Sequence, residues 1–238
     1  MNALTTREKE RYNRQIQLDE IGEEGQMKLK NARVLIVGVG GLGSPAALYL
    51  AGAGVGRIGL VDDDTVSESN LQRQVLYSEE EIGQPKALCA RKRLQALNGR
   101  IRIDAYPVRL TAENADGIVA NYDIVVDGCD NFATRYLIND TCVRLHKPYV
   151  YGAIREFDGQ VAVFNHEGGP DYRTLFPDEA GMLSLPLPPK AVLGVTPGIV
   201  GCAEANEALK LILGYGGTLS GKLWHIDLKT LETHTISL

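Results

Sequence analysis

The sequence predicts an α/β fold with a doubly wound, mostly parallel sheet, antiparallel strands near its carboxyl end and a long crossover loop. Short apolar runs alternate with helical patterns through the first two thirds of the chain. A glycine-rich turn joins the first of these runs to a helix. The strand-like runs of the last third are not each followed by a long helix, which favours antiparallel pairing. The 238 residues fit a single domain of this kind rather than two independent ones.

Residues 33–37 predict the first strand, and the lack of alternation between apolar and polar side chains indicates that both faces are covered. The preceding residues, 1–28, are charged and polar and predict a helical segment ahead of the sheet. A helix of small residues follows the first strand at 42–53, and the second strand follows at 57–62. A loop rich in Asp, Ser and Asn then leads to a helix at 86–97, where leucines recur at helical spacing.

The remaining elements complete a nucleotide-binding part, which we place at 33–165, and a carboxyl-terminal part at 195–238. Further strands are predicted at 101–106, 123–126, 149–151, 160–164, 222–227 and 233–237, and further helices at 113–121, 133–145 and 195–213, with Gly214 as the last helix cap. The crossover loop spans 166–194, and five of the ten prolines lie between Pro170 and Pro189. An irregular connection of this length in a compact domain is usually functional.

Composition and charge exclude several classes of protein. The 25 Lys and Arg residues against 30 Asp and Glu residues give a net charge of −5, which argues against a large nucleic-acid footprint. No apolar run approaches the roughly 20 residues that span a bilayer. The amino terminus is charged and polar rather than an apolar signal segment. We therefore expect a cytoplasmic protein with no membrane partner.

The four cysteines, Cys89, Cys129, Cys142 and Cys202, are far apart, and no two have the C-x-x-C spacing of a zinc site. A disulfide framework is not expected in a chain of this length that lacks an export signal. Cys89, Cys142 and Cys202 lie in helical patterns, so we expect them to pack as small apolar side chains. Cys129 differs because it directly precedes Asp130. A redox or sulfur role stays open for Cys129 and Cys202.

The turn from Gly38 to Gly43 fits the pattern G-x-G-x-x-G between a strand and a helix, which makes the predicted fold Rossmann-like. The candidate phosphate-binding glycines are Gly38, Gly40, Gly41 and Gly43. Glycines let a phosphate or ribose approach the backbone, and the helix amino terminus offers free N–H groups. Asp62 follows about 20 residues later, where a carboxylate can accept from ribose hydroxyls. The alternative is that the glycines only allow the helix to pack closely on the sheet.

The residues after the second strand favour ATP over NAD. A run of polar side chains from Ser69 to Gln74 includes Arg73, and Lys86 follows it. A triphosphate requires positive charge and hydrogen-bond donors, whereas nicotinamide requires an apolar slot. Each cation alone would more often be a solvated surface group, so the argument depends on their joint position. An NAD-dependent oxidoreductase stays as an alternative.

Together these motifs closely resemble the ThiF/MoeB/HesA adenylyltransferases, which are relatives of the ubiquitin-activating enzymes. The resemblance covers nearly the whole chain and rests on Arg11 to Gln15, Gly38 to Gly43, Asp62, Ser69 to Gln74, Gln84 to Lys86 and Asp127 to Asn131. It implies ATP-dependent adenylation of the C-terminal Gly-Gly carboxylate of a small ubiquitin-like sulfur-carrier protein, with release of pyrophosphate. The thiamine-thiazole and molybdopterin pathways both stay open.

The resemblance also implies roles for individual residues. The residues that it assigns to the nucleotide, besides the glycines, are Asp62, Ser69, Asn70, Leu71, Gln72, Arg73, Lys86, Asp130 and Asn131. Asp62 would hold the ribose, Asn70, Arg73 and Lys86 would engage the phosphates, and Asp130 would hold Mg²⁺. Asn131 can also cap a helix. The attacking carboxylate has a reference pKa of about 3.5, so it needs no general base at neutral pH.

A further role concerns Arg14, which lies in the amino-terminal helical segment. In the family, the matching arginine reaches across a homodimer to the neighbour's triphosphate, like an arginine finger. The resemblance therefore implies a homodimer in which each site uses Arg14 of the other subunit. The alternative is that Arg14 belongs to a charged, solvated helix face.

The sequence departs from the family in two places. Many relatives hold a zinc ion with two C-x-x-C pairs, but Asp171 and Thr174 occupy the cysteine positions here, so we expect no zinc. The crossover loop has no cysteine, so the activated carrier would receive sulfur from a separate donor. Adenylation of another carboxylate or a modified tRNA, and a binding protein that has lost catalysis, stay as alternatives. The intact Arg14, Arg73, Lys86 and Asp130 argue against the last of these.

Overall fold

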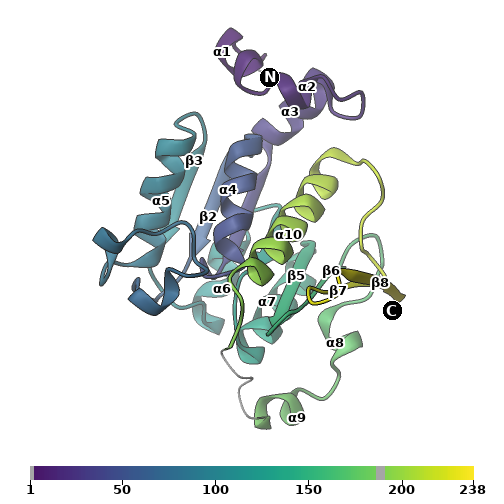
Figure 1. Cartoon of the computed structure of the whole chain (residues 1–238). Helices are drawn as coiled ribbons and strands as arrows, with labels where there is room; N and C mark the ends of the chain where they lie inside the picture. Colours follow the sequence, from purple (N-terminus) through teal and green to yellow (C-terminus); the bar gives the residue numbers. More distant parts are fainter. Residues whose placement is uncertain (1–2, 186–190) are drawn as a thin grey trace.

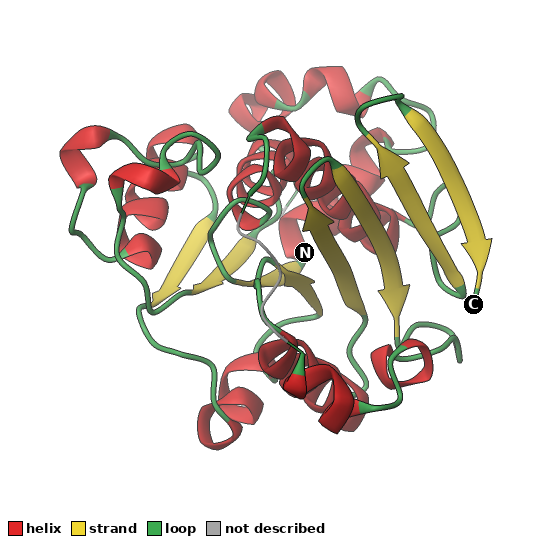
Figure 2. Ribbon diagram, turned by 60° about the horizontal axis from the view of Figure 1, so that its bottom comes forward, coloured by secondary structure: helices red, strands yellow, loops and turns green. Residues whose placement is uncertain are grey.

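The computed structural model describes residues 3–185 and 191–238, which form an eight-stranded sheet covered by helices on both faces (Figures 1 and 2). The strand order is β3-β2-β1-β4-β5-β6-β7-β8. The strands are β1 (Arg33–Val37), β2 (Arg57–Val61), β3 (Arg102–Tyr106), β4 (Ile124–Asp127), β5 (Tyr149–Arg155), β6 (Asp158–Phe164), β7 (Lys222–Asp227) and β8 (Glu232–Ser237). The pairs from β3 to β5 are parallel and those from β5 to β8 antiparallel, which confirms the predicted fold class.

The first strand shows why the apolar runs do not alternate with polar residues. Val34 and Ile36 belong to the core on one face of the sheet, whereas Leu35 and Val37 belong to the core on the other. The helices are α1 (Thr6–Arg11), α2 (Asn13–Ile16), α3 (Gly22–Asn31), α4 (Gly43–Ala53), α5 (Lys86–Leu97), α6 (Ala112–Val119), α7 (Phe132–Leu145), α8 (Tyr172–Leu175), α9 (Glu179–Ser184) and α10 (Val195–Leu213). The first core includes α3, α4, α5 and α10, and the second includes α6, α7 and α8.

The order of the strands positions the candidate site. β1 lies between β2 and β4. After β1 the chain continues to β2, and after β4 it continues to β5 in the opposite direction across the sheet. In open α/β sheets, ligands bind outside the carboxyl ends of the strands where the order reverses. The glycine turn after β1 and the turn after β4, which carries Asp130, meet at this edge.

The amino-terminal helices lie at the opposite edge of the sheet, above α4 in Figure 1. The Gln15 side chain donates to the carbonyl oxygen of Ala53, at the carboxyl end of α4, over 2.7 Å. The Tyr12 ring lies directly against Gly54, where a Cβ would collide with it. These contacts fix α1 and α2 at the end of α4 that is farther from the glycine turn.

The predicted crossover loop and the predicted strand at 149–151 need correction. The prediction of an irregular loop at 166–194 was wrong for 172–175 and 179–184, where α8 and α9 begin at side-chain caps from Asp171 and Asp178. The buried Tyr172 ring anchors α8 among other aromatic rings. Residues 186–190 of this predicted loop lie outside the described residues. In addition, β5 runs to Arg155 rather than Tyr151, because it forms a hairpin with β6.

Within the described ranges, no helix combines the length and the apolar character needed to cross a membrane.

Candidate functional site

The glycine turn is a close contact between two backbone segments at the edge of the sheet. Gly38 has a φ of +87°, which side-chain-bearing residues rarely adopt. A Cβ on Gly43 or on Gly128 would collide with the Gly38 carbonyl oxygen. Close packing therefore explains Gly43, as the alternative interpretation proposed. Gly40 and Gly41 differ because they are partly exposed, so a ligand can approach their backbone.

Asp62 directly follows β2 and faces the glycine turn. Its Oδ2 accepts the Val39 N–H at 2.7 Å, and its Oδ1 accepts the Asp64 N–H at 2.9 Å. Burial raises the pKa of the Asp62 carboxyl, and these two N–H groups and the nearby Lys86 oppose that shift. Each oxygen retains a further lone pair, so the carboxylate can still accept from a ribose.

The run from Ser69 to Gln74 folds over the same turn. The Asn70 carbonyl oxygen accepts from the N–H groups of Arg73 and Gln74 at 3.0 and 2.9 Å, which closes a tight turn after the short 3₁₀ helix Glu68–Asn70. The Arg73 guanidinium donates to the Ser69 carbonyl oxygen at 3.0 Å. The Arg73 side-chain stem lies beside Gly41, so the structure brings this cation to the glycine turn.

Other residues of this run have different surroundings. Ser69 and Gln72 are exposed, while Asn70 and Leu71 are half-buried. Gln74 is buried with its amide beside Gly40, and its Oε1 has no hydrogen-bond partner in the described part of the chain.

Lys86 is the first residue of α5 and is 4% exposed, so it is not the solvated surface group of the alternative interpretation. Its Nζ donates to Asp64 Oδ2 at 2.9 Å. The Lys86 N–H also donates to the Asp64 carbonyl oxygen at 2.9 Å, which fixes the start of α5 beside the end of β2. Asp64 had no predicted role, although it belongs to the acidic run that begins at Asp62.

The turn after β4 presents Asp130 to solvent at the edge next to the glycine turn. Asn131 Oδ1 accepts the Thr134 N–H at 2.9 Å, which confirms the helix-cap interpretation for Asn131. Behind this turn lie Asp127 and Arg135, whose roles the sequence analysis missed. In the sequence they are an acidic residue at the end of the strand and a basic residue in the first turn of the helix, eight positions apart.

Arg14 is the one predicted catalytic residue that lies away from this edge. It is exposed on α2, beside the carboxyl end of α4, whereas the glycine turn is at the amino end. A helix of the length of α4 spans about 16 Å. The described chain therefore does not bring Arg14 to its own glycine turn.

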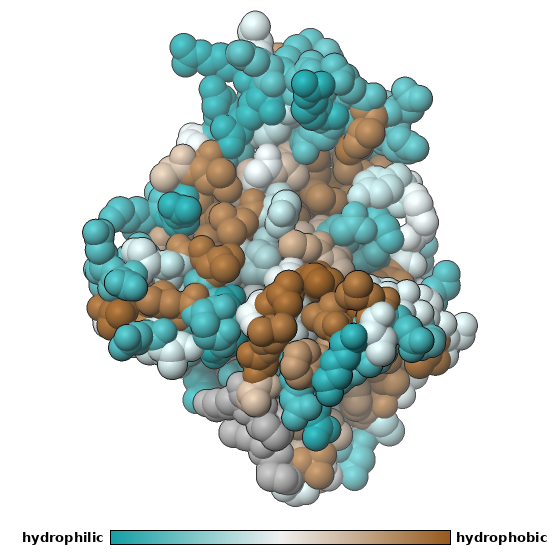
Figure 3. Space-filling model, viewed as in Figure 1, coloured by the Kyte–Doolittle hydropathy of each residue, from teal (hydrophilic) through white to brown (hydrophobic). Residues whose placement is uncertain are grey.

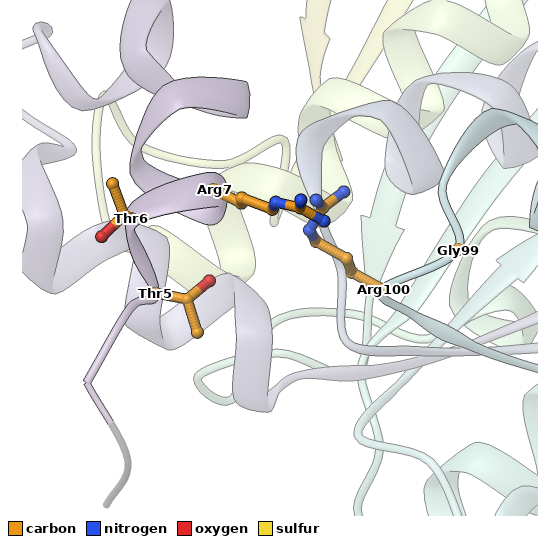
Figure 4. A pocket seen from close by; sticks show the side chains of 5 residues that line it. All are labelled: Thr5, Thr6, Arg7, Gly99 and Arg100. Atoms are coloured by element: carbon orange, nitrogen blue, oxygen red, sulfur yellow. The ribbon is translucent and has the colours of Figure 1, made fainter.

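Two surface pockets lie elsewhere. One is lined by Thr5, Thr6, Arg7, Gly99 and Arg100, and Figure 4 shows the Arg7 and Arg100 side chains directed toward each other. The other is lined by Gln84, Leu88, Cys89, Arg91, Lys92 and Gln95. Neither contains a predicted site residue, so the candidate site is an open edge rather than one of these two pockets.

The cysteines mostly follow the prediction. Cys89 and Cys142 are buried in helices, as expected, while Cys202 and Cys129 are partly exposed. Burial raises the pKa of the Cys129, Cys142 and Cys202 thiols, which disfavours the nucleophilic thiolate.

Zinc should be absent from the purified protein beyond trace amounts. Asp171 and Thr174 form a helix cap, in which Asp171 Oδ1 accepts the Thr174 N–H at 2.8 Å. Among the residues that the structure describes, no group of three or more His, Cys, Asp and Glu side chains is arranged to hold a metal. Elemental analysis of protein purified without added metals tests this. Stoichiometric zinc that survives dialysis against a chelator would contradict it.

Comparisons with known proteins show the family of the chain. The ThiF family model matches residues 12–238. The sulfur carrier protein adenylyltransferase of Thermus thermophilus is 56% identical over 229 residues, which cover 94% of this chain and 84% of that protein. The adenylyltransferase and sulfurtransferase MOCS3 of Culex quinquefasciatus is 49% identical, but this chain spans about half of that protein, 52%.

A solved structure of E. coli MccB with ATP has a similar fold, with a TM-score of 0.79 and 28% identity over 89% of this chain and 65% of that one. The family model covers nearly the whole chain, and the Thermus protein is more than half identical to it. The chain therefore belongs to the ThiF family, whose members are E1-like adenylyltransferases.

Proposed function

We propose that this chain uses ATP to adenylate the C-terminal Gly-Gly carboxylate of a small ubiquitin-like sulfur-carrier protein, releasing pyrophosphate. One observation carries the proposal: Asp62, Arg73 and Lys86 lie around the accessible glycines. The chain also belongs to an adenylyltransferase family. Relatives named sulfur carrier protein adenylyltransferase and MOCS3 support a sulfur carrier as the substrate. The pathway would be that of the thiamine thiazole or of molybdopterin, and sulfur would come from a separate donor.

The residues of this edge suit a reaction that needs alignment more than proton transfer. The carrier's terminal carboxylate is already ionised, because its reference pKa is about 3.5. Asp62 would hold the ribose, and the N–H groups of the glycine turn would face the phosphates. Arg73 and Lys86 would offset the negative charge that otherwise repels the attacking carboxylate. Attack on the α-phosphorus would leave an acyl-adenylate.

Asp130 is the residue suited to magnesium. Its carboxylate is exposed at the site edge, and Mg²⁺ in such sites is held by one or two carboxylates together with phosphate oxygens and waters. When bound, Mg²⁺ would neutralise charge on the phosphates. The absence of a group of three ligands among the described residues fits this mode rather than an all-protein metal cage.

We also infer that the working enzyme is a homodimer. Arg14 lies on the far side of α4 from its own glycine turn, so another subunit would have to supply it. Figure 3 shows apolar residues gathered over α4 and the start of α10, where Tyr49 is 61% and Val195 is 52% exposed. Exposed apolar surface of this kind favours an interface between subunits.

Exchange of label between pyrophosphate and ATP should require a carrier protein that ends in Gly-Gly. We expect a carrier lacking these residues to support no exchange, because it cannot place its carboxylate at the α-phosphorus. Lys86→Ala should reduce the exchange rate by about 10²-fold to 10³-fold through lost charge neutralisation. Lys92→Ala, at an exposed position of the same helix, is the matched control and should match the wild type.

Two outcomes would count against the proposal. Exchange that does not depend on the carrier tail would indicate another substrate, such as a different carboxylate or a modified tRNA. Tight binding of NAD together with weak binding of ATP would instead favour the oxidoreductase alternative.

A further inference from the structure

Behind the exposed carboxylate of Asp130 lies a buried ion pair that the chemistry above does not use. Arg135, in the first turn of α7, is 8% exposed, and Asp127, at the end of β4, is fully buried. The Arg135 Nε donates to Asp127 Oδ2 at 3.1 Å. The Tyr149 hydroxyl donates to the same oxygen at 2.7 Å. The two charges are therefore paired and bonded within the protein.

Asp127 and Arg135 bond to both backbone polar groups of Cys129, the residue before Asp130. The Cys129 N–H donates to Asp127 Oδ1 at 2.9 Å. The Cys129 carbonyl oxygen accepts from Arg135 Nη2 at 3.2 Å. On the other side of Asp130, Asn131 caps α7. Asp130 thus stands between two fixed residues while its own side chain faces solvent.

Arg135 also links this turn to the neighbouring strand. β4 and β5 pair at Val125↔Tyr149 and Val126↔Val150, and the described ladder ends there. Past that point, Arg135 Nη2 donates to the Gly152 carbonyl oxygen of β5 at 3.1 Å. Its guanidinium also lies 5.3 Å from the centre of the Tyr151 ring. One side chain therefore connects β4, the turn and β5 where the backbone hydrogen bonds between the strands stop.

A buried ion pair generally stabilises a fold no better than well-packed apolar side chains do. A guanidinium, however, presents several donors in a rigid plane and can fix several acceptors at once. Here the acceptors are a carboxylate and two carbonyl groups on separate segments. The arrangement is better suited to fixing the relative positions of these segments than to raising the free energy of unfolding.

We propose that Arg135 is a positioning residue for adenylation: it fixes the turn 128–131 so that Asp130 faces the magnesium-bound triphosphate in one orientation. This inference rests on the proposed function. It assigns Arg135 no contact with substrate, since its bonds are to Asp127, Cys129 and Gly152.

Arg135→Lys tests the role because an ammonium keeps the charge but cannot reach all three acceptors in the plane of the guanidinium. We expect kcat for ATP–pyrophosphate exchange to fall by about 10-fold to 100-fold with little change in the KM for ATP, as for a misplaced catalytic group. The magnesium concentration that gives half of the maximal rate should rise. Arg144→Lys, on the same helix and in an exposed pair with Asp116, is the matched control and should change neither value.

A measurement without nucleotide separates positioning from activity. In Arg135→Lys, the backbone amides of Cys129 and Asp130 should exchange hydrogen faster, while those of β1 keep their wild-type rates. If Arg135→Lys does not fold, Tyr149→Phe removes one bond to Asp127 and should produce a smaller change of the same kind.

A double-mutant cycle supplies the last test. If Arg135 acts through Asp130, Arg135→Lys should cost much less in an Asp130→Asn protein than in the wild type. Additive losses, or unchanged amide exchange in the turn, would overturn the positioning role. Wild-type protein without exchange activity would count against the proposed function instead, and the amide-exchange result would still decide whether Arg135 fixes the turn.

Discussion

Equal amounts of an Arg14→Ala protein and an Asp130→Ala protein, each nearly inactive alone, should recover about a quarter of wild-type exchange activity once their subunits have mixed. Random pairing makes about half of the dimers hybrid, and each hybrid of a two-fold dimer contains one intact site and one doubly altered site. Removal of an arginine supplied in trans costs about 10³-fold or more in related phosphate chemistry. The recovered activity would therefore stand far above the background of either parent.

The expectation follows from the position of α2. Gln15, the neighbour of Arg14, bonds to the carboxyl end of α4, and the glycine turn begins the same helix at its other end. A two-fold axis through the apolar face of α4 and α10 would bring α2 of one subunit toward the glycine turn of the other. On this expectation, the apolar face of α4 and α10 is the dimer interface, and Arg14 serves the site of the other subunit.

The mixing experiment needs evidence that hybrids form. Native mass spectrometry of the mixture, with one parent isotopically labelled, reports the hybrid fraction. Arg7→Ala, exposed on the neighbouring helix α1, is the control and should be active alone. Hybrid dimers that form without recovery of activity would rule out sharing of Arg14, as would a fully active monomer.

The fold was predictable where burial on both faces leaves a clear pattern. The run at 33–37 supplies side chains to both cores, so its lack of alternation indicated a central parallel strand. The helices α8 and α9 were missed because prolines and glycines surround them. Their formation depends on local caps from Asp171 and Asp178 and on the burial of Tyr172, which requires the aromatic rings of distant strands.

The part of the candidate site that belongs to sequence motifs was predictable. The glycine turn, Asp62, Arg73 and Lys86 were named from the sequence, and the structure brings them to one edge. Asp127 and Arg135 were not assigned roles, because their bonds to Tyr149 and Gly152 cross from one strand and helix to another strand. Such contacts have no signature in local spacing and become visible only once the strand order is known.

Glu204→Gln should make the protein more stable than the wild type, by a margin that grows as pH rises above about 5. Glu204 lies in α10, is fully buried against Gly152, and neither carboxyl oxygen has a hydrogen-bond partner in the described residues. Burial raises its pKa well above the usual range. Asp127 adds to that rise and Arg135 opposes it. Glutamine has nearly the same shape and carries no ionisable proton.

The sign follows from proton binding. Between the pKa of the unfolded chain, about 4.3, and the raised pKa of the folded protein, the unfolded chain has lost the Glu204 proton while the folded protein retains it. Stability is therefore greatest below that window and falls as pH rises through it, by up to about 1.4 kcal/mol per pH unit. Glutamine removes this contribution, so the two proteins should differ least near pH 4 and most at alkaline pH.

Urea unfolding at pH 6, 7 and 8, at one protein concentration, measures the difference. Glu207→Gln is the matched control one turn further along α10, because Glu207 is also buried but bonds to Lys210 Nζ at 2.6 Å and to the Leu219 N–H at 2.8 Å. Loss of those charged acceptors should lower stability by about 1–3 kcal/mol. Parallel stability curves for the wild type and Glu204→Gln would mean that Glu204 keeps an ordinary pKa. An ordinary pKa would require a partner for the ionised carboxylate, which the described residues do not supply.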